Sequence, residues 1–377
     1  MNHTIAHLMW NTNATLPEIA ERLRAARRIL VLTHLKPDGD AVGSTLAVVR
    51  ALNQPSAWTS SSTPKAKVWY YGPPPPWLSE LAADTPYRLV TRDQPPPLLD
   101  ADPSAEPDLI LILDTGSWNQ LEPIAEWLSP RRERAIIVDH HAQGDDDVAP
   151  TKYIDVASAA VCQPAAELCR LVLGLESIAA LPAPVANALY LGLATDTGWF
   201  RHSNVSPTAM QTAAELLRAG ADHVRLYHMS EQNSLGRLLL IGRALNTLEL
   251  ACDGRLAVMS ITKKDMEECH AAPGDTGGIT DYSQSLGSVR VSAMLSEASP
   301  ADFGLANDGR PFTKISLRSK AVAPAVDVNV IAKDFGGGGH VRASGARLDA
   351  DIETTKKRII ELVNAQITGT VQPRSPL

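Results

Sequence analysis

The sequence predicts an α/β protein: an N-terminal, doubly wound and mainly parallel sheet, followed across a cleft by a smaller C-terminal α+β domain. Continuous apolar runs at 29–33, 109–113 and 135–138 are typical of strands buried on both faces of a sheet. Helical spacing alternates with these runs, as in parallel α/β units. After Gly220 the pattern changes, because two short runs flank Asp253-Gly254, a hairpin signal.

The remaining elements follow from caps and periodicity. Thr15 and Glu18 form a capping-box pattern that opens a helix to about Ala26, and Ser206-Pro207 opens another that Gly220 ends. Further helices are expected at 41–52, 164–173, 185–194, 226–245, 263–270, 328–333 and 355–366, and further strands at 67–70, 247–251, 256–261, 289–295 and 313–317. We therefore expect a first domain at 12–220, a helical linker at 221–245 and a second domain at 246–366.

Length and composition limit the function classes. The chain has 377 residues, enough for two domains, with 44% hydrophobic and 20% charged residues, which excludes wholesale disorder, collagen and coiled coil. Its net charge of −7 argues against coating duplex DNA, and no apolar stretch approaches a membrane span. Residues 1–10 do not resemble a signal peptide, and the four cysteines form no CxxC pair. A cytoplasmic protein with free thiols is expected.

Acidic and imidazole side chains gather where the predicted elements of the first domain end. In chain order they are His34, Asp38, Asp40, Asp114, Asp139, His140, His141 and Asp196. Taken singly, a tight turn, a helix cap or an ordinary loop explains each of them. In a doubly wound sheet, however, ligands bind at the carboxyl ends of the strands, so the fold should bring all four segments together.

Several carboxylates in one cleft repel each other unless they protonate or bind a cation. Oxygen ligands mixed with imidazole suit Mn²⁺, Fe²⁺, Co²⁺ or Zn²⁺. Four aspartates and two histidines exceed what one small ion usually takes, so a two-metal site with one bridging carboxylate is expected. Such sites hydrolyse phosphate esters by activating a water molecule and clamping the attacking and leaving oxygens.

These segments resemble the four motifs of the DHH phosphoesterase family. They are His34-Leu35-Lys36-Pro37-Asp38-Gly39-Asp40-Ala41, Asp114, Asp139-His140-His141 and Asp196-Thr197-Gly198. Gly336-Gly337-Gly338-Gly339-His340 is similar to the signature of the DHH-associated C-terminal domain, and 316–320 and 326–329 also match it. The resemblance covers about residues 12 to 366, and the two-domain length is most similar to the nanoRNase and pAp-phosphatase branch.

The resemblance implies a role for each residue. His34 and Asp38 would bind one Mn²⁺, the other would be held by Asp40, His140 and Asp196, and Asp114 would bridge the two ions. Asp139 would orient a histidine, and His141 would lie near the scissile phosphate, where it assists the leaving oxygen or binds phosphate. In the second domain, Arg318 and the glycine loop Gly337-Gly338-Gly339-His340 would hold the far end of the nucleotide. Taken alone, a tight turn explains the loop and a solvated strand face explains Arg318.

The expected activity is hydrolysis of very short single-stranded RNA and of 3′-phosphoadenosine 5′-phosphate (pAp) by a metal-activated water, without a covalent intermediate. The gap between the domains would select short substrates by reach. Hydrolysis of cyclic dinucleotides is the related alternative, and a non-catalytic nucleotide sensor is the alternative of another class. A long-strand exonuclease would need a basic channel, and the pyrophosphatase branch lacks this glycine-histidine pattern. The oligomeric state stays open, a homodimer included.

Two positions depart from the family pattern. Relatives commonly carry an arginine six residues after the aspartate of the second motif, where this chain has Gln120. They also carry hydroxyl residues where this chain has Gln163-Pro164-Ala165. Both positions lie outside the expected metal ligands, so they bear on substrate preference rather than on metal binding.

Overall fold

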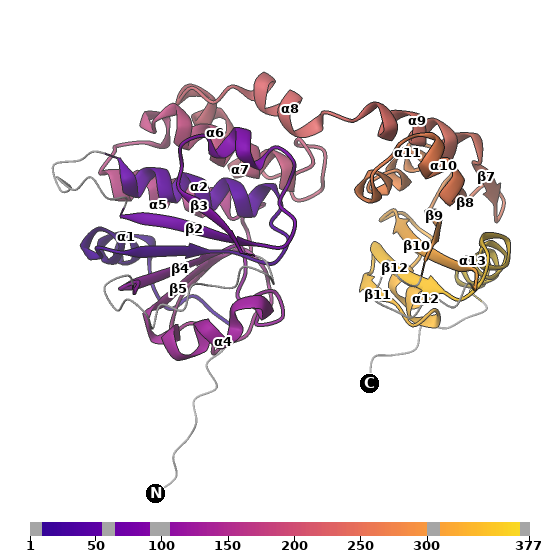
Figure 1. The fold of residues 1–377 in the computed structure, drawn as a ribbon, viewed down its shortest axis with the longest axis horizontal. Coiled ribbons are helices and arrows are strands. Elements are labelled where there is room, and N and C mark those ends of the chain that lie inside the picture. The colour runs from indigo at the N-terminus through magenta and orange to yellow at the C-terminus, as the bar shows by residue number, and fades with distance from the viewer. Residues whose placement is uncertain (1–9, 55–64, 91–105, 300–309, 370–377) are drawn as a thin grey trace, which may run out of the picture. The chain divides into compact units, whose positions relative to one another are not determined.

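The computed structural model describes residues 10–54, 65–90, 106–299 and 310–369 (Figure 1). The chain divides into two compact units, one ending at Glu231 and the other beginning at Gln232. This boundary falls inside the segment 221–245 that the sequence predicts as a linker. No helix among the described residues is both long enough and apolar enough to cross a bilayer.

The first unit is built on a six-stranded sheet in the order β3-β2-β1-β4-β5-β6. Every neighbouring pair in it is parallel. Its strands are β1 (Ile29–Leu32), β2 (Ala66–Tyr71), β3 (Tyr87–Val90), β4 (Leu109–Leu113), β5 (Ala135–Asp139) and β6 (Thr151–Ile154). The three predicted apolar strands form the centre and are fully buried. The edge strands β3 and β6 escaped prediction because they are partly exposed and lack an apolar run.

Helices cover the sheet of the first unit. They are α1 (Leu16–Ala25), α2 (Gly39–Asn53), α3 (Leu78–Ala82), α4 (Ala125–Leu128), α5 (Cys162–Leu173), α6 (Ala183–Asp196), α7 (Pro207–Arg218) and α8 (His223–Glu231). One sheet face packs against α1, α2, α5 and α6, and the other against the segment around α4. The predicted capping box opens α1, and Ser206 caps α7 as expected. The doubly wound prediction is confirmed.

The strand order places the candidate site. From β1, the sheet continues through β2 to β3 on one side, and through β4 and β5 to β6 on the other side. The order therefore reverses between β1 and β4, which pair directly through residues 29–32 and 109–112. In doubly wound sheets the crevice outside the carboxyl ends of the strands at this point is where ligands bind.

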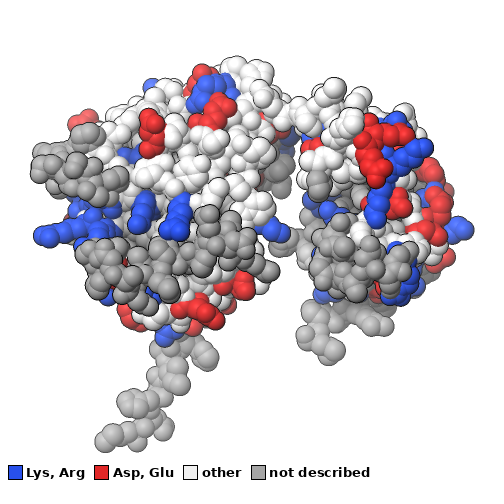
Figure 2. Space-filling view, in the orientation of Figure 1, with Lys and Arg blue, Asp and Glu red and all other residues white. Residues whose placement is uncertain are grey.

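The second unit contains another six-stranded sheet, in the order β11-β12-β10-β9-β8-β7. Its strands are β7 (Glu249–Ala251), β8 (Leu256–Ile261), β9 (Val291–Ala298), β10 (Phe312–Ser319), β11 (Gly338–His340) and β12 (Ala343–Leu348). Its helices are α9 (Leu235–Asn246), α10 (Lys263–Glu268), α11 (Thr280–Gln284), α12 (Val328–Asp334) and α13 (Ile352–Ile367). Only β8 and β9 pair in parallel among these described strands, so the α+β prediction is confirmed. Acidic and basic side chains are interspersed on the face of this unit drawn in Figure 2.

The prediction of a single long helix at 226–245 is wrong. The structure has α8 up to Glu231 and α9 from Leu235, with a break at 232–234. Ser234 is in extended conformation, and its side chain accepts a hydrogen bond from the Arg237 backbone amide at 3.0 Å. A serine that caps a new helix satisfies an orphan backbone amide there. Residues 232–234 are all polar and exposed, so they interrupt the apolar pattern that flanks them on both sides.

Candidate metal centre

The segment after β1 supplies three of the predicted residues. His34 lies two residues beyond the end of β1, and Asp38 is the N-cap of α2. The Asp38 Oδ1 atom accepts hydrogen bonds from the backbone amides of Asp40 and Ala41 at 3.0 and 3.1 Å. Asp40, in the first turn of α2, is buried. The turn at residues 37–40 thus also caps α2, and this places the carboxylates of Asp38 and Asp40 at this edge of the sheet.

The ends of β4 and β5 supply the central residues. Asp114 directly follows β4 in a left-handed conformation with φ of 65°, a region that costs a non-glycine residue strain and is enriched at functional sites. Asp139 is the last residue of β5 and is fully buried. Its Oδ1 atom accepts hydrogen bonds from the His140 amide at 2.7 Å, the His141 amide at 3.2 Å and the His141 Nδ1 atom at 2.8 Å.

Asp196 arrives from α6, whose end it forms. Close packing of α2 on α6 brings it near. A Cβ atom at Gly43 would lie 2.4 Å from the Ala188 carbonyl oxygen, and one at Gly192 would lie 3.0 Å from the Gly39 carbonyl oxygen. Since neither helix could approach this closely with larger residues there, the two glycines help to set the distance between Asp40 and Asp196.

The structure brings the predicted ligands together as two groups. One consists of His34, Asp38 and Asp114, and the other of Asp40, His140 and Asp196; within each group the ligand atoms lie within 4.8 Å of one another. Asp114 lies between the groups. Its Oδ2 atom is 3.4 Å from Nε2 of His34, and its Oδ1 atom is 3.4 Å from Nε2 of His140. Asp114, Asp139, His140 and His141 form a further such group.

Both imidazoles present the same nitrogen to Asp114. Nδ1 of His34 lies 3.0 Å from the Leu35 carbonyl oxygen, and Nδ1 of His140 lies 3.3 Å from the Ser158 carbonyl oxygen. An imidazole that donates through Nδ1 carries its lone pair on Nε2, as metal-binding histidines do. Backbone carbonyls therefore hold both rings in the tautomer and orientation that a metal ligand requires.

The charges at this edge perturb one another strongly. Burial alone would lower the pKa of His34, but the carboxylates of Asp114 and Asp38 outweigh it and raise the pKa to about 11. Burial would also lower the pKa of His140, but the carboxylates of Asp114 and Asp40 outweigh it and raise that pKa to about 10. Burial raises the pKa of Asp196 to about 6. Burial together with repulsion from Asp114 and Asp196 also raises the pKa of Asp40.

A cation would relieve this arrangement. Oδ1 of Asp114 and Oδ2 of Asp139 are buried, and within the described part of the chain neither accepts a hydrogen bond. A buried carboxylate oxygen that accepts no hydrogen bond costs free energy, and a hard divalent ion satisfies both its charge and its lone pairs. The set of aspartate oxygens and imidazole nitrogens suits a transition metal. The residues present therefore fit the metal site that the sequence predicts.

His141 differs from the candidate ligands. Its side chain is 54% exposed, and its Nδ1 atom is bound to Asp139. That hydrogen bond raises the pKa of His141, and the Asp139 charge adds to the effect against the opposing effect of burial. Its Nε2 atom is not engaged by Asp139, so the ring can hold a proton next to the candidate ligands.

In the second unit, Arg318 and His340 lie close on one sheet. Arg318 of β10 and His340 of β11 both pair with Ala343 of β12, so they occupy one row on the same face, about 10 Å apart at the backbone. The prediction of a loop at 337–340 is partly wrong, because Gly338–His340 forms the edge strand β11. A Cβ atom at Gly337 would lie 2.2 Å from the Gly345 carbonyl oxygen, so close backbone packing requires that glycine.

The two departures from the family pattern have different surroundings. Gln120 is exposed, and its backbone carbonyl accepts a hydrogen bond from the Leu35 amide at 2.9 Å. Gln163 is buried, and its Oε1 atom accepts a hydrogen bond from the Ala159 amide at 2.7 Å. Gln163 thus braces the turn that precedes α5, while Gln120 leaves a side chain free to meet solvent near His34.

Sequence reasoning missed several groups that shape the site. The backbone amides of Val161 and Cys162, at the start of α5, donate to the Asp40 carboxylate at 2.6 and 3.0 Å. Asn204 donates to the Asp196 carbonyl oxygen at 3.3 Å, and Trp10 donates to the His141 carbonyl oxygen at 3.0 Å. Backbone groups carry no residue-type signal, and the tryptophan lies far from the motifs in the sequence.

Comparisons with known proteins agree with this geometry. The model of the DHH family N-terminal domain matches residues 28–193. The chain is 28% identical over 372 residues to the bifunctional oligoribonuclease and PAP phosphatase NrnA of Thermus thermophilus, covering 94% of this chain and 98% of that protein. It is 23% identical to the cyclic-di-AMP phosphodiesterase PdeA of Listeria monocytogenes, covering 93% of this chain but 49% of that protein.

A solved structure extends the likeness to the fold of both units. An exopolyphosphatase-related protein from Bacteroides fragilis superposes with a TM-score of 0.75 at 23% identity, covering 94% of this chain and 97% of that one. The DHH match includes every candidate metal ligand except Asp196. The chain therefore contains a segment, residues 28–193, that matches the DHH family N-terminal domain.

Proposed function

We propose that the chain is a metal-dependent phosphoesterase that hydrolyses short oligoribonucleotides of about two to five nucleotides to 5′-mononucleotides, and pAp to AMP. The observation that carries this proposal is Asp114, whose two oxygens face the Nε2 atoms of His34 and His140 at 3.4 Å each. A carboxylate placed between two such ligand groups is the arrangement expected of a two-metal phosphoesterase.

The ligands divide between the two groups. His34 and Asp38 would hold one ion, Asp40, His140 and Asp196 the other, and Asp114 both. Two divalent ions, with Mn²⁺ the proposed species, would supply a water of lowered pKa and charge stabilisation for the attacking and leaving oxygens. The amides at the start of α5 hold the Asp40 carboxylate in place, as outer partners of metal ligands do.

His141 and Asp139 would act on the leaving group. The Asp139 carboxylate fixes the His141 ring through Nδ1 and favours its protonated form. The His141 Nε2 atom then holds a proton that the departing ribose oxygen can take, or a positive charge that binds the phosphate. Asp139 is thus proposed as the residue that orients His141, and Asp114 as the shared ligand.

The second unit would bind the rest of the nucleotide. Arg318 can pair with a phosphate through two N–H groups, and His340 lies in the same row of the same sheet face. Gly338 is exposed and has no atom closer than 3.9 Å to its Cβ position, so a ligand can approach the backbone there, whereas Gly337 and Gly339 pack closely against β12. A protein that grips both the scissile phosphate and a nearby end of the substrate favours short chains over long ones.

The names of the relatives support this substrate class. The Thermus protein, similar along nearly its whole length, is named for oligoribonuclease and PAP phosphatase activities. The Listeria protein is named for cyclic-di-AMP hydrolysis, so a cyclic dinucleotide is the second candidate substrate. A non-catalytic nucleotide sensor is the third possibility to test, but its ligand set would be broken, whereas this one is assembled.

One assay plate tests the proposal. Purified protein with Mn²⁺, or with EDTA, meets pAp, a 5′-phosphorylated diribonucleotide, a 24-mer RNA and cyclic di-AMP, with His140→Ala as the control for contaminating hydrolases. We expect metal-dependent cleavage of pAp and the dinucleotide, and much slower cleavage of the 24-mer.

The other outcomes decide against it in different ways. Faster hydrolysis of cyclic di-AMP than of pAp and the dinucleotide would replace the proposed substrates with the second candidate. Equal rates on the 24-mer and the dinucleotide would overturn selection for short substrates. Metal and nucleotide binding without any cleavage would identify a sensor.

A further inference from the structure

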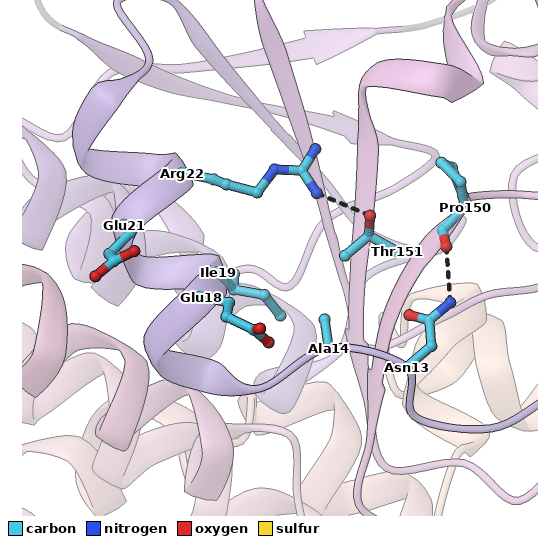
Figure 3. A pocket seen from close by; sticks show the side chains of 8 residues that line it. All are labelled: Asn13, Ala14, Glu18, Ile19, Glu21, Arg22, Pro150 and Thr151. Atoms are coloured by element: carbon cyan, nitrogen blue, oxygen red, sulfur yellow. Dashed lines mark hydrogen bonds between the residues drawn. The ribbon is translucent and has the colours of Figure 1, made fainter.

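The first described residues of the chain form a strap along the edge strand of the first sheet. In this N-terminal strap (residues 10–14), Thr12 Oγ1 donates to the Ile154 carbonyl oxygen at 2.9 Å and accepts from its amide at 2.7 Å. Asn13 donates to the Pro150 carbonyl oxygen at 2.8 Å and accepts from the Lys152 amide at 2.7 Å. Figure 3 shows Asn13 reaching Pro150 at one wall of a pocket. The strap is thus anchored to β6 along its length.

The strap places Trp10 against two glycines. A Cβ atom at Gly116 would come within 1.8 Å of the indole Cη2 atom, and one at Gly144 within 2.5 Å of it. Neither glycine has a positive φ, and the three atoms nearest to the Cβ position of each all belong to the indole, so the indole is what an alanine would meet first at both positions. The ring therefore fills a slot that exists because both residues lack side chains.

The two glycines belong to the loops that carry the candidate site. Gly116 follows Asp114 after β4, and Gly144 follows His141 after β5. The loops are also joined directly, because the Asp145 amide donates to the Gly116 carbonyl oxygen at 2.8 Å and the Trp118 amide donates to Asp145 Oδ2 at 2.7 Å. Trp10 is wedged at this junction, with its indole N–H bound to the His141 carbonyl oxygen at 3.0 Å.

We propose that Trp10 is a positioning residue for the reaction: its indole, wedged between the two loops, fixes the backbone that carries His141. The inference rests on the proposed function, in which His141 serves the leaving group. The His141 side chain is 54% exposed and is held at its ring by Asp139, so its position depends on the backbone below it. A misplacement of about 1 Å in such a group can cost about a hundredfold in rate.

The bond from Trp10 goes to His141 and not to a candidate metal ligand. We therefore expect the loss of Trp10 to affect turnover rather than metal content or substrate affinity. In Trp10→Ala, kcat for pAp should fall at least tenfold, KM should stay within about threefold, and bound metal should stay at the wild-type level. Trp10→Phe fills part of the slot but has no N–H donor, so its kcat should lie between those of Trp10→Ala and the wild type.

A matched control separates positioning from general loss of packing. Trp127 also packs against the hydrophobic cluster that Trp10 covers, but on the side of α4, where it contacts Trp69 and Arg131. Trp127→Ala should lower the melting temperature at least as much as Trp10→Ala while leaving kcat unchanged.

A double-mutant cycle then tests the wedge itself. Gly116→Ala should evict the indole and lower kcat as Trp10→Ala does, whereas adding Gly116→Ala to Trp10→Ala should change kcat little. A Trp10→Ala enzyme with kcat within twofold of wild type overturns the inference, as do additive effects of the two substitutions or a loss of bound metal. If the wild-type chain cleaves none of the substrates, the proposed function fails and this inference with it.

Discussion

The candidate residues of the two sheets differ in burial, and therefore in how strongly their charges need a bound ligand. At the carboxyl edge of the first sheet, Asp40, Asp114 and Asp139 are each no more than 3% exposed, and two of their oxygens accept no hydrogen bond from the described residues. On the second sheet, His340 is exposed and Arg318 is half-buried. Buried charge is costly unless a counter-ion compensates it, whereas water satisfies exposed charge. Burial at the carboxyl edge of the first sheet therefore indicates a bound cation, whereas the exposure of Arg318 and His340 on the second sheet does not indicate a bound anion.

The largest expected effect tests the first half of this comparison. Asp114→Ala should lower turnover by at least about a thousandfold and reduce bound metal, because a shared ligand serves both ions. Metal analysis of the purified variant and steady-state kinetics on pAp would measure this. Asp108→Ala is the matched control, since Asp108 precedes the same strand at its opposite end and caps the amides of Arg27 and Arg28. Wild-type turnover in Asp114→Ala would contradict a dinuclear site.

The second prediction uses the protons on the ligands. With pKa values of about 11 and 10, His34 and His140 are protonated at pH 7 in the metal-free protein. A metal needs the lone pair on Nε2, so binding two ions should release about two protons, and affinity should rise with pH. Calorimetry in two buffers of different ionisation enthalpy counts the released protons. A count of zero would mean that these histidines are not ligands.

The same shifts predict the stability of the metal-free protein. Each histidine has a pKa raised above the unfolded value of about 6.5, so it stabilises the fold fully below that pH. The stabilisation is lost as pH rises towards the folded values of about 10 and 11. In EDTA, the free energy of unfolding should therefore decline from neutral to alkaline pH, and this decline should shrink in His34→Gln.

A smaller effect tests the second half of the comparison. Arg318→Ala should raise KM for pAp about 10- to 150-fold, the equivalent of ~1.5–3 kcal/mol for a charged hydrogen bond, with bound metal unchanged. Lys333→Ala, which removes another cation of the same unit from α12, should leave KM as it was. An unchanged KM in Arg318→Ala would assign Arg318 to the structure of β10, where it already bonds to the Leu317 carbonyl oxygen.

What the sequence could predict depended on how far each signal reaches along the chain. The central strands and the ligand set were predictable because apolar runs and acidic strand ends are local, and parallel strands bring their ends to one edge. The strands β3 and β6 were not, since edge strands are partly exposed and lack a strong pattern. The contacts of Trp10 were also hidden, because residues 131 positions apart meet there.

The glycine-rich segment shows the limit of motif reading. Four consecutive glycines and a histidine predicted an anion-binding loop, but a glycine can be needed for space, for an unusual φ or for a ligand, and the sequence does not tell these apart. In the structure Gly337 is needed for space against Gly345, Gly339 has a φ of 143°, and Gly338 has no atom closer than 3.9 Å to its Cβ position.

The smallest expected effect therefore separates packing from binding within this segment. Gly337→Ala should destabilise the protein by ~1–3 kcal/mol, because its Cβ atom would meet the Gly345 carbonyl oxygen of β12 at 2.2 Å and the backbone must shift. Gly338→Ala should leave the melting temperature unchanged, since open space receives the methyl group. If the substrate lies against this strand, that methyl group should still raise KM several-fold. A Gly338→Ala variant with wild-type KM would confine the glycines to packing and leave nucleotide binding in this unit to Arg318 and His340.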